Sequence, residues 1–337
     1  MGPPDPAPVL DLMEAFRRSK CLFAGVSLGL FDLLHDAPQS PLALAETCGC
    51  AREPLARLLD GLCALGLLER QDGLYRNLPV ASAFLRRASS QTLAGYIQYA
   101  DQALYPMWGH LEDALREAAP RWRQTFGRDA ALFEHFFRTP EARAGFIQGM
   151  HGLGLLSSPA VVRAFDLREF RHCADLGGAT GHLAAAACEH YGEMRATLFE
   201  MPEVVELARP YLARSPAASR IECVTGDFFR DPLPKADLYA LGRILHDWRE
   251  DKIALLLDRI HAALPSGGGL LLAERLLDED PPGPVSVLMQ SLNMLVCTEG
   301  RERTLAEYRT LLEAAGFSPV EGRRTGAPLD AILARRK

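Results

Sequence analysis

A glycine-rich turn between a short apolar run and an alanine-rich run constrains the fold of this chain more than any other stretch. Residues 172–176 read HCADL, residues 177–181 read GGATG, and residues 183–188 read LAAAAC. This order predicts a strand, a sharp turn and a helix. Glycine allows a sharp turn and lets a ligand approach bare backbone, next to the unpaired amides at the start of a helix. We therefore expect a ligand-binding site at this turn.

Beyond residue 172 the chain alternates apolar runs with helical patterns. Strands are predicted at 172–176, 195–199, 221–225, 237–241 and 269–275, and near 319–324 and 329–334. Helices are predicted at 182–190, 203–213 and 249–263, and around 286–297 and 305–315. This alternation indicates an α/β domain whose parallel sheet is covered on both faces. In such a domain the ligand lies beyond the carboxyl ends of the strands.

Three acidic residues lie at or just beyond the predicted strand ends. Asp175 stands two residues before the first glycine of the turn, Glu200 follows the second strand, and Asp227 follows the third. Glu200 can accept hydrogen bonds from both hydroxyls of a ribose, and Asp227 with Phe228 can hold the edge and the face of an adenine. These residues suit a nucleoside ligand without a pyrophosphate.

A nicotinamide dinucleotide is the alternative ligand, and the glycine spacing argues against it. The dinucleotide-binding motif has the pattern G-x-G-x-x-G. Counting from Gly177, the two later glycine positions of that motif hold Ala179 and His182. The turn therefore lacks the motif.

The first hundred residues predict a second, helical region. Residues 1–10 are expected to be disordered. Between residues 11 and 34 apolar residues fall on nearly every side of a helix, which therefore requires burial, for example in a partner subunit. Two short helices, at 41–46 and 52–67, precede a hairpin with its turn at Asp72 and Gly73. Two helices followed by a hairpin predict a winged helix.

DNA binding is an alternative function for a winged helix, and the charge argues against it. The helix that would enter the groove offers Arg52 and Arg57 against Glu53, Asp60 and Glu69. The whole chain carries a net charge of −6, which disfavours binding to nucleic acid or to an anionic membrane. No nucleic-acid or membrane partner is expected.

The cysteines and the N-terminus indicate a cytoplasmic protein. The eight cysteines include no C-x-x-C pair, so reduced thiols are expected. The first residues are proline-rich and acidic, and they lack the basic-then-apolar order of a signal peptide. No apolar run approaches the roughly 18 residues that a membrane span requires.

Residues 82–158 predict helices that are rich in aromatic side chains. Most of these rings are expected to fill a helical core. Those near Pro106 and between residues 133 and 150 could instead form the wall of a pocket for a flat ligand.

Five motifs carry a resemblance to a known family. They are DLGGATG at 175–181, GDFF at 226–229, HDW at 246–248, the glycines 267–269 and GRERT at 300–304. In order and spacing they resemble the S-adenosylmethionine-dependent O-methyltransferases of the acetylserotonin O-methyltransferase family, which act on small aromatic hydroxyls. The resemblance runs from about residue 12 to the end, and it is strongest to the methyltransferase region of the acetylserotonin O-methyltransferase-like proteins.

The resemblance implies a Rossmann-like class I methyltransferase domain, preceded by an all-helical, winged-helix dimerisation domain. It also implies an intertwined homodimer, S-adenosylmethionine as methyl donor, and a hydroxyindole-like aromatic hydroxyl as acceptor. The expected domains are residues 11–100 for dimerisation, 101–165 as a helical linker and substrate-pocket region, and 166–337 for donor binding.

Methyl transfer from a sulfonium to a hydroxyl is an in-line displacement, which requires an aligned hydroxyl and a base for its proton. His246 is the candidate base, because it follows the strand at 237–241 on the ligand side and a neutral histidine suits this role near pH 7. The resemblance implies that Asp247, Glu274 and Glu302 orient the imidazole or stabilise its protonated form. Capping of the next helix is the alternative role of Asp247.

The resemblance and the strand-end pattern together predict the binding residues. The predicted donor contacts are Phe137, Asp175, Gly177, Gly178, Glu200, Gly226, Asp227, Phe228 and Arg243. The predicted substrate contacts are Asn293 and Met294, with core filling as the alternative role of Met294. No metal site is expected.

Four departures from the family pattern keep the function open. Ala179 stands at the middle glycine of the turn, which would cost about 1–2 kcal/mol if its backbone requires a positive φ. Glu200 replaces a common aspartate, and Phe137 replaces a tyrosine. Gly154 stands where close relatives carry a tryptophan against the donor.

Three functions therefore stand as alternatives. The first is an active O-methyltransferase on an aromatic hydroxyl. The second is a donor-binding pseudo-enzyme with a degenerate substrate pocket, which would act through its dimer or a fused domain. The third is a winged-helix regulator, which the charge of the chain disfavours.

Overall fold

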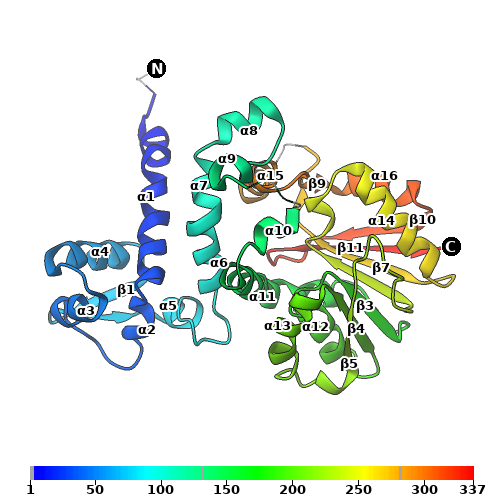
Figure 1. Cartoon of the computed structure of the whole chain (residues 1–337), viewed down its shortest axis with the longest axis horizontal. Coiled ribbons are helices and arrows are strands. Elements are labelled where there is room, and N and C mark those ends of the chain that lie inside the picture. Colours follow the sequence, from blue (N-terminus) through cyan, green and yellow to red (C-terminus); the bar gives the residue numbers. More distant parts are fainter. Residues whose placement is uncertain (1–3, 129, 131, 281–282) are drawn as a thin grey trace. The chain divides into compact units, whose positions relative to one another are not determined.

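The computed structural model describes residues 4–128, 130, 132–280 and 283–337. The chain divides into two compact units, Met1–Ala103 and Leu104–Lys337, and Figure 1 labels most of their helices and strands. Each unit contains its own buried hydrophobic cluster.

The first unit is mainly helical and contains one hairpin. Its elements are α1 (Ala7–Ser27), α2 (Leu30–Leu33), α3 (Pro41–Cys48), α4 (Arg52–Ala64), β1 (Leu68–Gln71), β2 (Leu74–Asn77), α5 (Pro79–Phe84), α6 (Ala94–Tyr99) and the π-helix η1 (Ala100–Leu104), which runs across the unit boundary. The hairpin pairs Gln71 with Leu74 across a turn in which Asp72 and Gly73 both have a positive φ. Such a turn matches the twist of the two strands. The helices and the hairpin predicted for a winged helix are confirmed.

The first helix begins earlier than the sequence predicts. The expectation of disorder over residues 1–10 is wrong for residues 7–10, which are helical, and residues 1–3 lie outside the described residues. Asp5 Oδ1 accepts a hydrogen bond from the Ala7 N–H at 3.0 Å. Pro8 fits the first turn, because the amides there have no partner within a helix.

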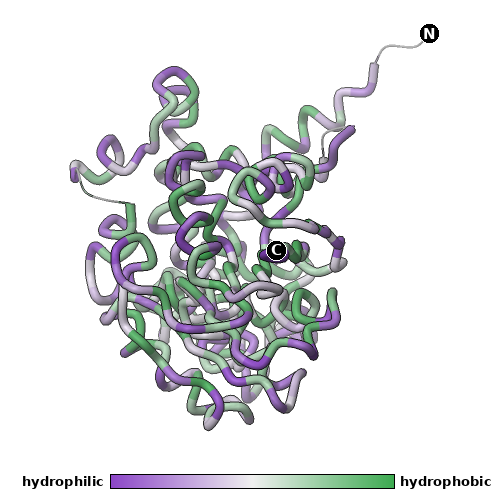
Figure 2. Tube along the Cα trace, turned by 90° about the vertical axis from the view of Figure 1, so that its right-hand side faces the viewer, coloured by the Kyte–Doolittle hydropathy of each residue, from purple (hydrophilic) through white to green (hydrophobic). Residues whose placement is uncertain are grey.

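The N-terminal half of α1 exposes apolar side chains. Five of them are more than half exposed: Val9, Leu10, Leu12, Met13 and Phe16. Figure 2 shows hydrophobic and hydrophilic segments alternating along the first turns of this helix. The expected burial is therefore reached only near the end of α1, and its first turns present an apolar surface that a partner could cover.

Surface charge on the first unit is largely internally balanced. Arg57 pairs with Glu53 on α4, and Arg70 pairs with Asp60 at 3.3 Å. Such pairing weakens the positive field that a phosphate backbone would require. Within the described part of the chain, no helix combines the length and the hydropathy needed to cross a membrane.

The second unit begins with helices and continues as an α/β domain. Its first helices are α7 (Tyr105–Trp108), α8 (Leu111–Glu117), α9 (Trp122–Phe126), α10 (Leu132–Phe136) and α11 (Pro140–Arg163). The later helices are α12 (His182–His190), α13 (Pro202–Leu212), η2 (Ala218–Arg220), η3 (Leu245–Asp247), α14 (Glu250–Ala263), α15 (Val285–Cys297) and α16 (Leu305–Ala314). The strands are β3 (His172–Leu176), β4 (Arg195–Glu200), β5 (Ile221–Thr225), β6 (Leu238–Gly242), β7 (Gly269–Glu274), β8 (Leu276–Leu277), β9 (Arg303–Thr304), β10 (Phe317–Arg323) and β11 (Asp330–Arg336).

The central sheet has the order β10-β11-β7-β6-β3-β4-β5. The strands from β7 to β5 are parallel, and β10 and β11 close the sheet antiparallel. β3 and β6 are neighbours, with Ala174 paired to Tyr239, although β4 and β5 lie between them in the sequence. The strand order therefore reverses at β3, and ligands of such sheets bind in the crevice at that point. The predicted Rossmann-like fold is confirmed.

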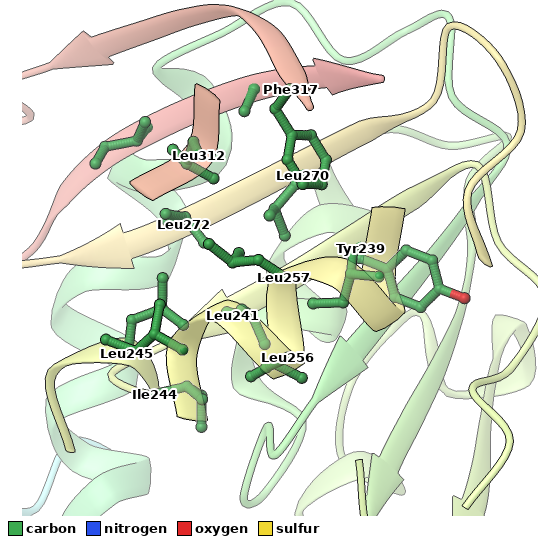
Figure 3. Packing of buried hydrophobic residues seen from close by; sticks show 14 of the residues in the cluster. Tyr239, Leu241, Ile244, Leu245, Leu256, Leu257, Leu270, Leu272, Leu312 and Phe317 are labelled. Atoms are coloured by element: carbon green, nitrogen blue, oxygen red, sulfur yellow. The ribbon is translucent and has the colours of Figure 1, made fainter. Parts of the chain in front are cut away.

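Side chains alternate between two cores along the central strands. On β6, Tyr239 and Leu241 belong to one buried cluster, whereas Leu238 and Ala240 belong to the other. Figure 3 shows the first cluster, in which Leu257 of α14 lies among side chains of β6 and β7. Successive residues of a strand point to opposite faces, so two cores require helices on both sides of the sheet.

The helical segment 101–165 is not a separate linker. Beyond residue 103 it belongs to the second unit. The end of α11 contributes Val161 and Val162 to the same buried cluster as Cys173 of β3 and Ala184 of α12. This segment buries its apolar residues with those of the sheet, so it forms part of the α/β domain.

Candidate active site

The candidate site lies at the carboxyl ends of five parallel strands. These ends carry the glycine turn 177–181 after β3, Glu200 on β4, residues 226–228 after β5, residues 243–247 after β6, and Glu274 on β7. Parallel neighbours bring their carboxyl ends to one edge of the sheet. The strand-end residues predicted from the sequence are therefore gathered at one edge.

Two glycines of the turn are required by their contacts. Gly177 has a φ of 67°, and a Cβ atom there would lie 2.8 Å from Ile244 Cδ1 and 3.1 Å from Phe228 Cε1. A Cβ atom on Gly178 would overlap the carboxylate of Asp175. The turn therefore packs directly against side chains from the ends of β5 and β6.

Asp175 is fully buried beside the turn. Its Oδ2 accepts a hydrogen bond from the Ala184 N–H of α12 at 3.2 Å, whereas Oδ1 has no hydrogen-bond partner among the described residues. Burial raises the pKa of this carboxyl to about 7. A buried oxygen without a partner is an acceptor that a ligand could satisfy.

Ala179 has a φ of 51°, so the middle of the turn does adopt the left-handed conformation. The strain of about 1–2 kcal/mol expected for an alanine there applies to this chain. Burial raises the pKa of Glu200 to about 8, although the Met201 N–H, at 3.1 Å, and the Ala179 amide favour its charged form. The Glu200 carboxylate is therefore held next to the turn.

The end of β5 presents an aromatic ring to the turn. Gly226 is required there, because a Cβ atom would overlap the ring of Phe199. Asp227 Oδ1 accepts a hydrogen bond from the Phe229 N–H at 2.8 Å, which shapes the loop. The loop places Phe228 against Gly177. The ligand contacts of Asp227 and Phe228 stay a prediction.

Arg243 follows β6 with a φ of 57°, a conformation that costs energy for any residue but glycine. Its N–H donates to the Ala273 carbonyl at 3.0 Å. Its charge favours the charged form of Asp247 and the neutral form of His182. Backbone strain of this kind gathers at functional sites.

His246 lies in η3 and is 4% exposed. Its Nδ1 is 2.9 Å from Glu302 Oε1 and 3.7 Å from Glu274 Oε2. Its Nε2 is 3.7 Å from Asp247 Oδ1, beyond hydrogen-bond length. The structure therefore brings together all four residues of the predicted catalytic group, with Glu302 as the direct partner of Nδ1.

The charge of His246 differs from the expected neutral state. Burial would lower its pKa, but the charges of Glu302, Glu274 and Asp247 outweigh burial and raise it to about 9. Burial raises the pKa of Glu274 to about 7 and that of Asp247 to about 6. In this arrangement the imidazole is protonated at pH 7, because three carboxyl groups surround it.

Glu274 also holds the backbone around η3. Its Oε1 accepts hydrogen bonds from the N–H groups of Ile244 and Leu245, at 3.1 and 2.9 Å. One ligand atom each from His246, Glu274 and Glu302 lie within 4.8 Å of one another, so this group has the geometry to hold a cation. The expected absence of a metal stays a prediction.

Gly300, in the loop before β9, and Arg303, the first residue of β9, support His246 and were not singled out from the sequence. A Cβ atom on Gly300 would overlap the His246 carbonyl, so the loop can approach η3 only with glycine there. Arg303 is 1% exposed and donates to the carbonyls of Leu245 and Trp248, both at 3.3 Å. Both residues lie in the GRERT motif, which is the signal that could have identified them.

The predicted substrate residues make contacts within the chain. Asn293 is 8% exposed, and its Oδ1 accepts a hydrogen bond from Trp108 Nε1 at 2.9 Å. Met294 is buried, and its carbonyl accepts a hydrogen bond from the Thr298 N–H at 2.7 Å. Core packing of Met294 agrees with these contacts, and a substrate role for either residue stays a prediction.

Phe137 lies in a chain of aromatic rings that ends at the β5 loop. It contacts Phe133 with a centroid distance of 6.0 Å, and Phe133 lies 5.8 Å from Trp248. Trp248 lies 5.1 Å from Phe229, which contacts Phe228. These rings could form the wall of a pocket for a flat molecule, and the donor contact of Phe137 stays a prediction.

Two family models match the chain. The O-methyltransferase domain matches residues 108–318, and the O-methyltransferase dimerisation domain matches residues 10–87. Acetylserotonin O-methyltransferase of Bos taurus is 42% identical, with 97% of this chain and 96% of that protein covered. The human protein described as a probable bifunctional dTTP/UTP pyrophosphatase/methyltransferase protein is also 42% identical, with 99% of this chain covered. The chain spans only 54% of its length.

Solved structures match over the whole length as well. Human N-acetylserotonin methyltransferase in complex with SAM is 40% identical and has a TM-score of 0.94, with 100% of this chain and 99% of that chain covered. PigF with SAH is 31% identical and has a TM-score of 0.89, with 99% and 100% covered.

Proposed function

The chain belongs to the O-methyltransferase family, and on this premise we propose that it transfers a methyl group from S-adenosylmethionine to the hydroxyl of a small aromatic molecule resembling a hydroxyindole. One observation carries the proposal: a buried histidine, held at Nδ1 by Glu302, lies at the same strand edge as a glycine turn. The names of the relatives support the donor and the acceptor class.

The residues of the turn fit the donor. Gly177 and Gly178 leave bare backbone, the orphaned Oδ1 of Asp175 offers an acceptor, and the carboxyl group of Glu200 suits a ribose. Phe228 offers a ring face to an adenine. When bound, S-adenosylmethionine supplies an activated methyl group. Holding it in line with the acceptor hydroxyl contributes about 7–11 kcal/mol in favourable cases.

His246 serves as the base through Nε2, because Nδ1 already contacts Glu302. With its pKa at about 9, the imidazole must first lose a proton. The positive charge of a bound donor would lower the pKa of His246, because like charges disfavour the protonated form, and the proton would be released to solvent. Glu302 then stabilises the imidazolium that forms when Nε2 takes the proton of the acceptor hydroxyl. Base catalysis of this kind contributes roughly 10²–10⁴-fold.

The chain acts as a homodimer in the cytoplasm. The match to a dimerisation domain over residues 10–87 and the exposed apolar side chains of α1 support the dimer, and an intertwined arrangement would cover them. The eight cysteines, all free thiols, fit a reducing compartment. None of the relatives favours the pseudo-enzyme alternative.

A two-part experiment tests the proposal. Calorimetry with S-adenosylmethionine measures donor binding, and radiolabelled methyl transfer is screened on hydroxyindoles, catechols and flavonoids. We expect donor binding and the fastest transfer to a hydroxyindole such as N-acetylserotonin. Donor binding without transfer to any aromatic hydroxyl would favour the pseudo-enzyme, and no donor binding would remove both functions.

A further inference from the structure

The space above Gly154 on α11 is filled by the imidazole of His182. A Cβ atom on Gly154 would overlap three atoms of that ring, Cγ, Cδ2 and Nε2. Contact with three ring atoms at once means that the face of the imidazole, and not its edge, covers this point of the helix. Only a residue without a side chain at 154 leaves room for the ring.

The backbone and the side chain of His182 are both held in place. It is the first residue of α12, directly after the glycine turn, so its backbone is fixed by the turn. Its Nδ1 lies 2.8 Å from the hydroxyl of Ser158, which is 3% exposed. Ser158 is four residues after Gly154 and therefore lies on the same face of α11.

The same face of α11 also contacts the glycine turn. His151 stands three residues before Gly154, and its Nδ1 lies 2.7 Å from Thr180 Oγ1. His151 packs on Tyr211 of α13 with a ring-centroid distance of 4.2 Å. The ring of His182 thus lies between α11 and the glycine turn, and the residue stays partly exposed.

The surroundings keep the His182 imidazole uncharged. Desolvation within the fold, followed by the charges of His151 and Arg243, lowers its pKa to about 3. A neutral ring is compatible with a nearby sulfonium cation, whereas an imidazolium would repel it.

We propose that His182, next to the glycine turn, supplies a ring that packs against the bound donor. The inference rests on the proposed function, because it needs a donor at the turn. The absence of a side chain at Gly154 is then the condition that admits the His182 ring.

The position of His182 along the turn also indicates which part of the donor its ring contacts. Phe228 lies at Gly177, the first residue of the turn, whereas His182 follows Gly181, the last. If the adenine lies on Phe228, the other end of the turn faces the amino-acid portion of the donor. We therefore assign the His182 ring to that portion.

Calorimetry with S-adenosylhomocysteine and with 5′-methylthioadenosine, which lacks the amino-acid portion, tests the assignment. His182→Ala should weaken S-adenosylhomocysteine about 5- to 10-fold and leave 5′-methylthioadenosine unchanged. His182→Phe should retain most of the affinity. Gly154→Trp should weaken binding, and the double variant His182→Ala/Gly154→Trp should bind more tightly than either single variant, because one ring again fills the space.

The control is Gly145→Ala on the same helix, where an added Cβ atom meets nothing within 4 Å, and thermal unfolding shows that each variant is folded. Unchanged binding by His182→Ala would overturn the inference, as would a folded double variant no better than the singles, or equal weakening of both probes. In those cases binding by the wild type keeps the proposed function intact. A wild type that binds neither probe would overturn the proposed function itself.

Discussion

Two histidines flank the glycine turn in different surroundings. His246 follows β6 and meets three carboxyl groups, which raise its pKa to about 9. His182 follows the turn after β3 and lies near the hydroxyl of Ser158, His151 and Arg243; desolvation, followed by His151 and Arg243, lowers its pKa to about 3. The same side chain is therefore prepared for proton transfer in one place and for packing as a neutral ring in the other.

The two histidines differ in protonation because their surroundings differ, although the residue type is the same. The carboxyl groups around His246 arrive from three segments, at 247, 274 and 302, whereas the partners of His182 lie on α11 and in the β6 loop. Desolvation lowers the pKa of both rings; at His246 the neighbouring carboxyl groups reverse the sign of the shift, whereas at His182 no carboxyl group of the described residues opposes it. Substitutions that act on one histidine and not on the other test this division.

Removal of the His246 imidazole should have the largest effect. His246→Asn should lower kcat by roughly 10²–10⁴-fold, because the acceptor hydroxyl loses its base. The dissociation constant of S-adenosylhomocysteine should stay within about twofold, because His246 is assigned to the acceptor side. Radiolabelled methyl transfer and calorimetry measure the two quantities. A variant with normal kcat would remove His246 from the mechanism.

Displacement of the loop that carries Glu302 should have the next largest effect. Gly300→Ala forces the loop away from the His246 carbonyl, and a shift of about 1 Å at a catalytic group can cost about 10²-fold in rate. Gly192→Ala is the matched control, because an added Cβ atom there meets nothing within 4 Å. Steady-state kinetics measure kcat for both variants. Equal kcat values for Gly300→Ala and Gly192→Ala would mean that the position of the loop does not affect catalysis by His246.

The pH dependence of stability should separate the two histidines. An unfolded histidine has a pKa of about 6.5. The raised pKa of His246 adds stability that is present below about pH 6.5 and lost as the pH rises through 9. The lowered pKa of His182 removes stability as the pH falls from 6.5 towards 3.

Urea unfolding between pH 5 and 9, compared for wild type and His182→Phe, measures this difference. Between pH 6.5 and 5, the free energy of unfolding should fall less for the variant than for wild type. Between pH 6.5 and 9, it should fall by the same amount in both proteins, because His246 is present in both. Parallel curves for the two proteins across the whole range would contradict a lowered pKa at His182.

Relief of strain in the turn should have the smallest effect. Ala179→Gly removes a left-handed alanine, so it should stabilise the turn by about 1 kcal/mol and tighten donor binding about fivefold. Ala118→Gly, at a φ of 49° directly after α8, should stabilise the fold without changing donor affinity. Calorimetry measures the donor affinity of each variant, and urea unfolding measures its stability. Equal donor affinity in wild type and Ala179→Gly would show that the strain does not reach the binding site.

Much of the fold could be predicted because local patterns determine it. The strands of the central sheet and the helices α12 to α16 follow from apolar periodicity and glycine turns, with ends that differ by a few residues, whereas the short strands β8 and β9 were not predicted. The start of α1 was not predicted; the Ala7 N–H donates a hydrogen bond to the Asp5 carboxylate there, a contact that the apolar pattern does not reveal. The place of segment 101–165 within the second unit could not be predicted either, because it depends on packing between distant residues.

The candidate site was predictable in position and less so in chemistry. Strand ends indicated where Glu200, Asp227 and His246 lie, because parallel strands align their carboxyl ends. The charge of His246 was not predictable, since it depends on three acids that only the fold brings together. The pairing of His182 with Gly154 joins residues 28 positions apart in the sequence, and no local pattern connects them.

A crystal structure with S-adenosylhomocysteine would show directly where the donor binds and which way His246 points. We expect the ligand to lie against Gly177 and Gly178, the His182 ring to pack on its amino-acid portion, and Nε2 of His246 to face the open side where a hydroxyl would bind. A ligand bound away from the turn, or a His246 whose Nε2 is turned into the carboxyl cluster, would contradict it.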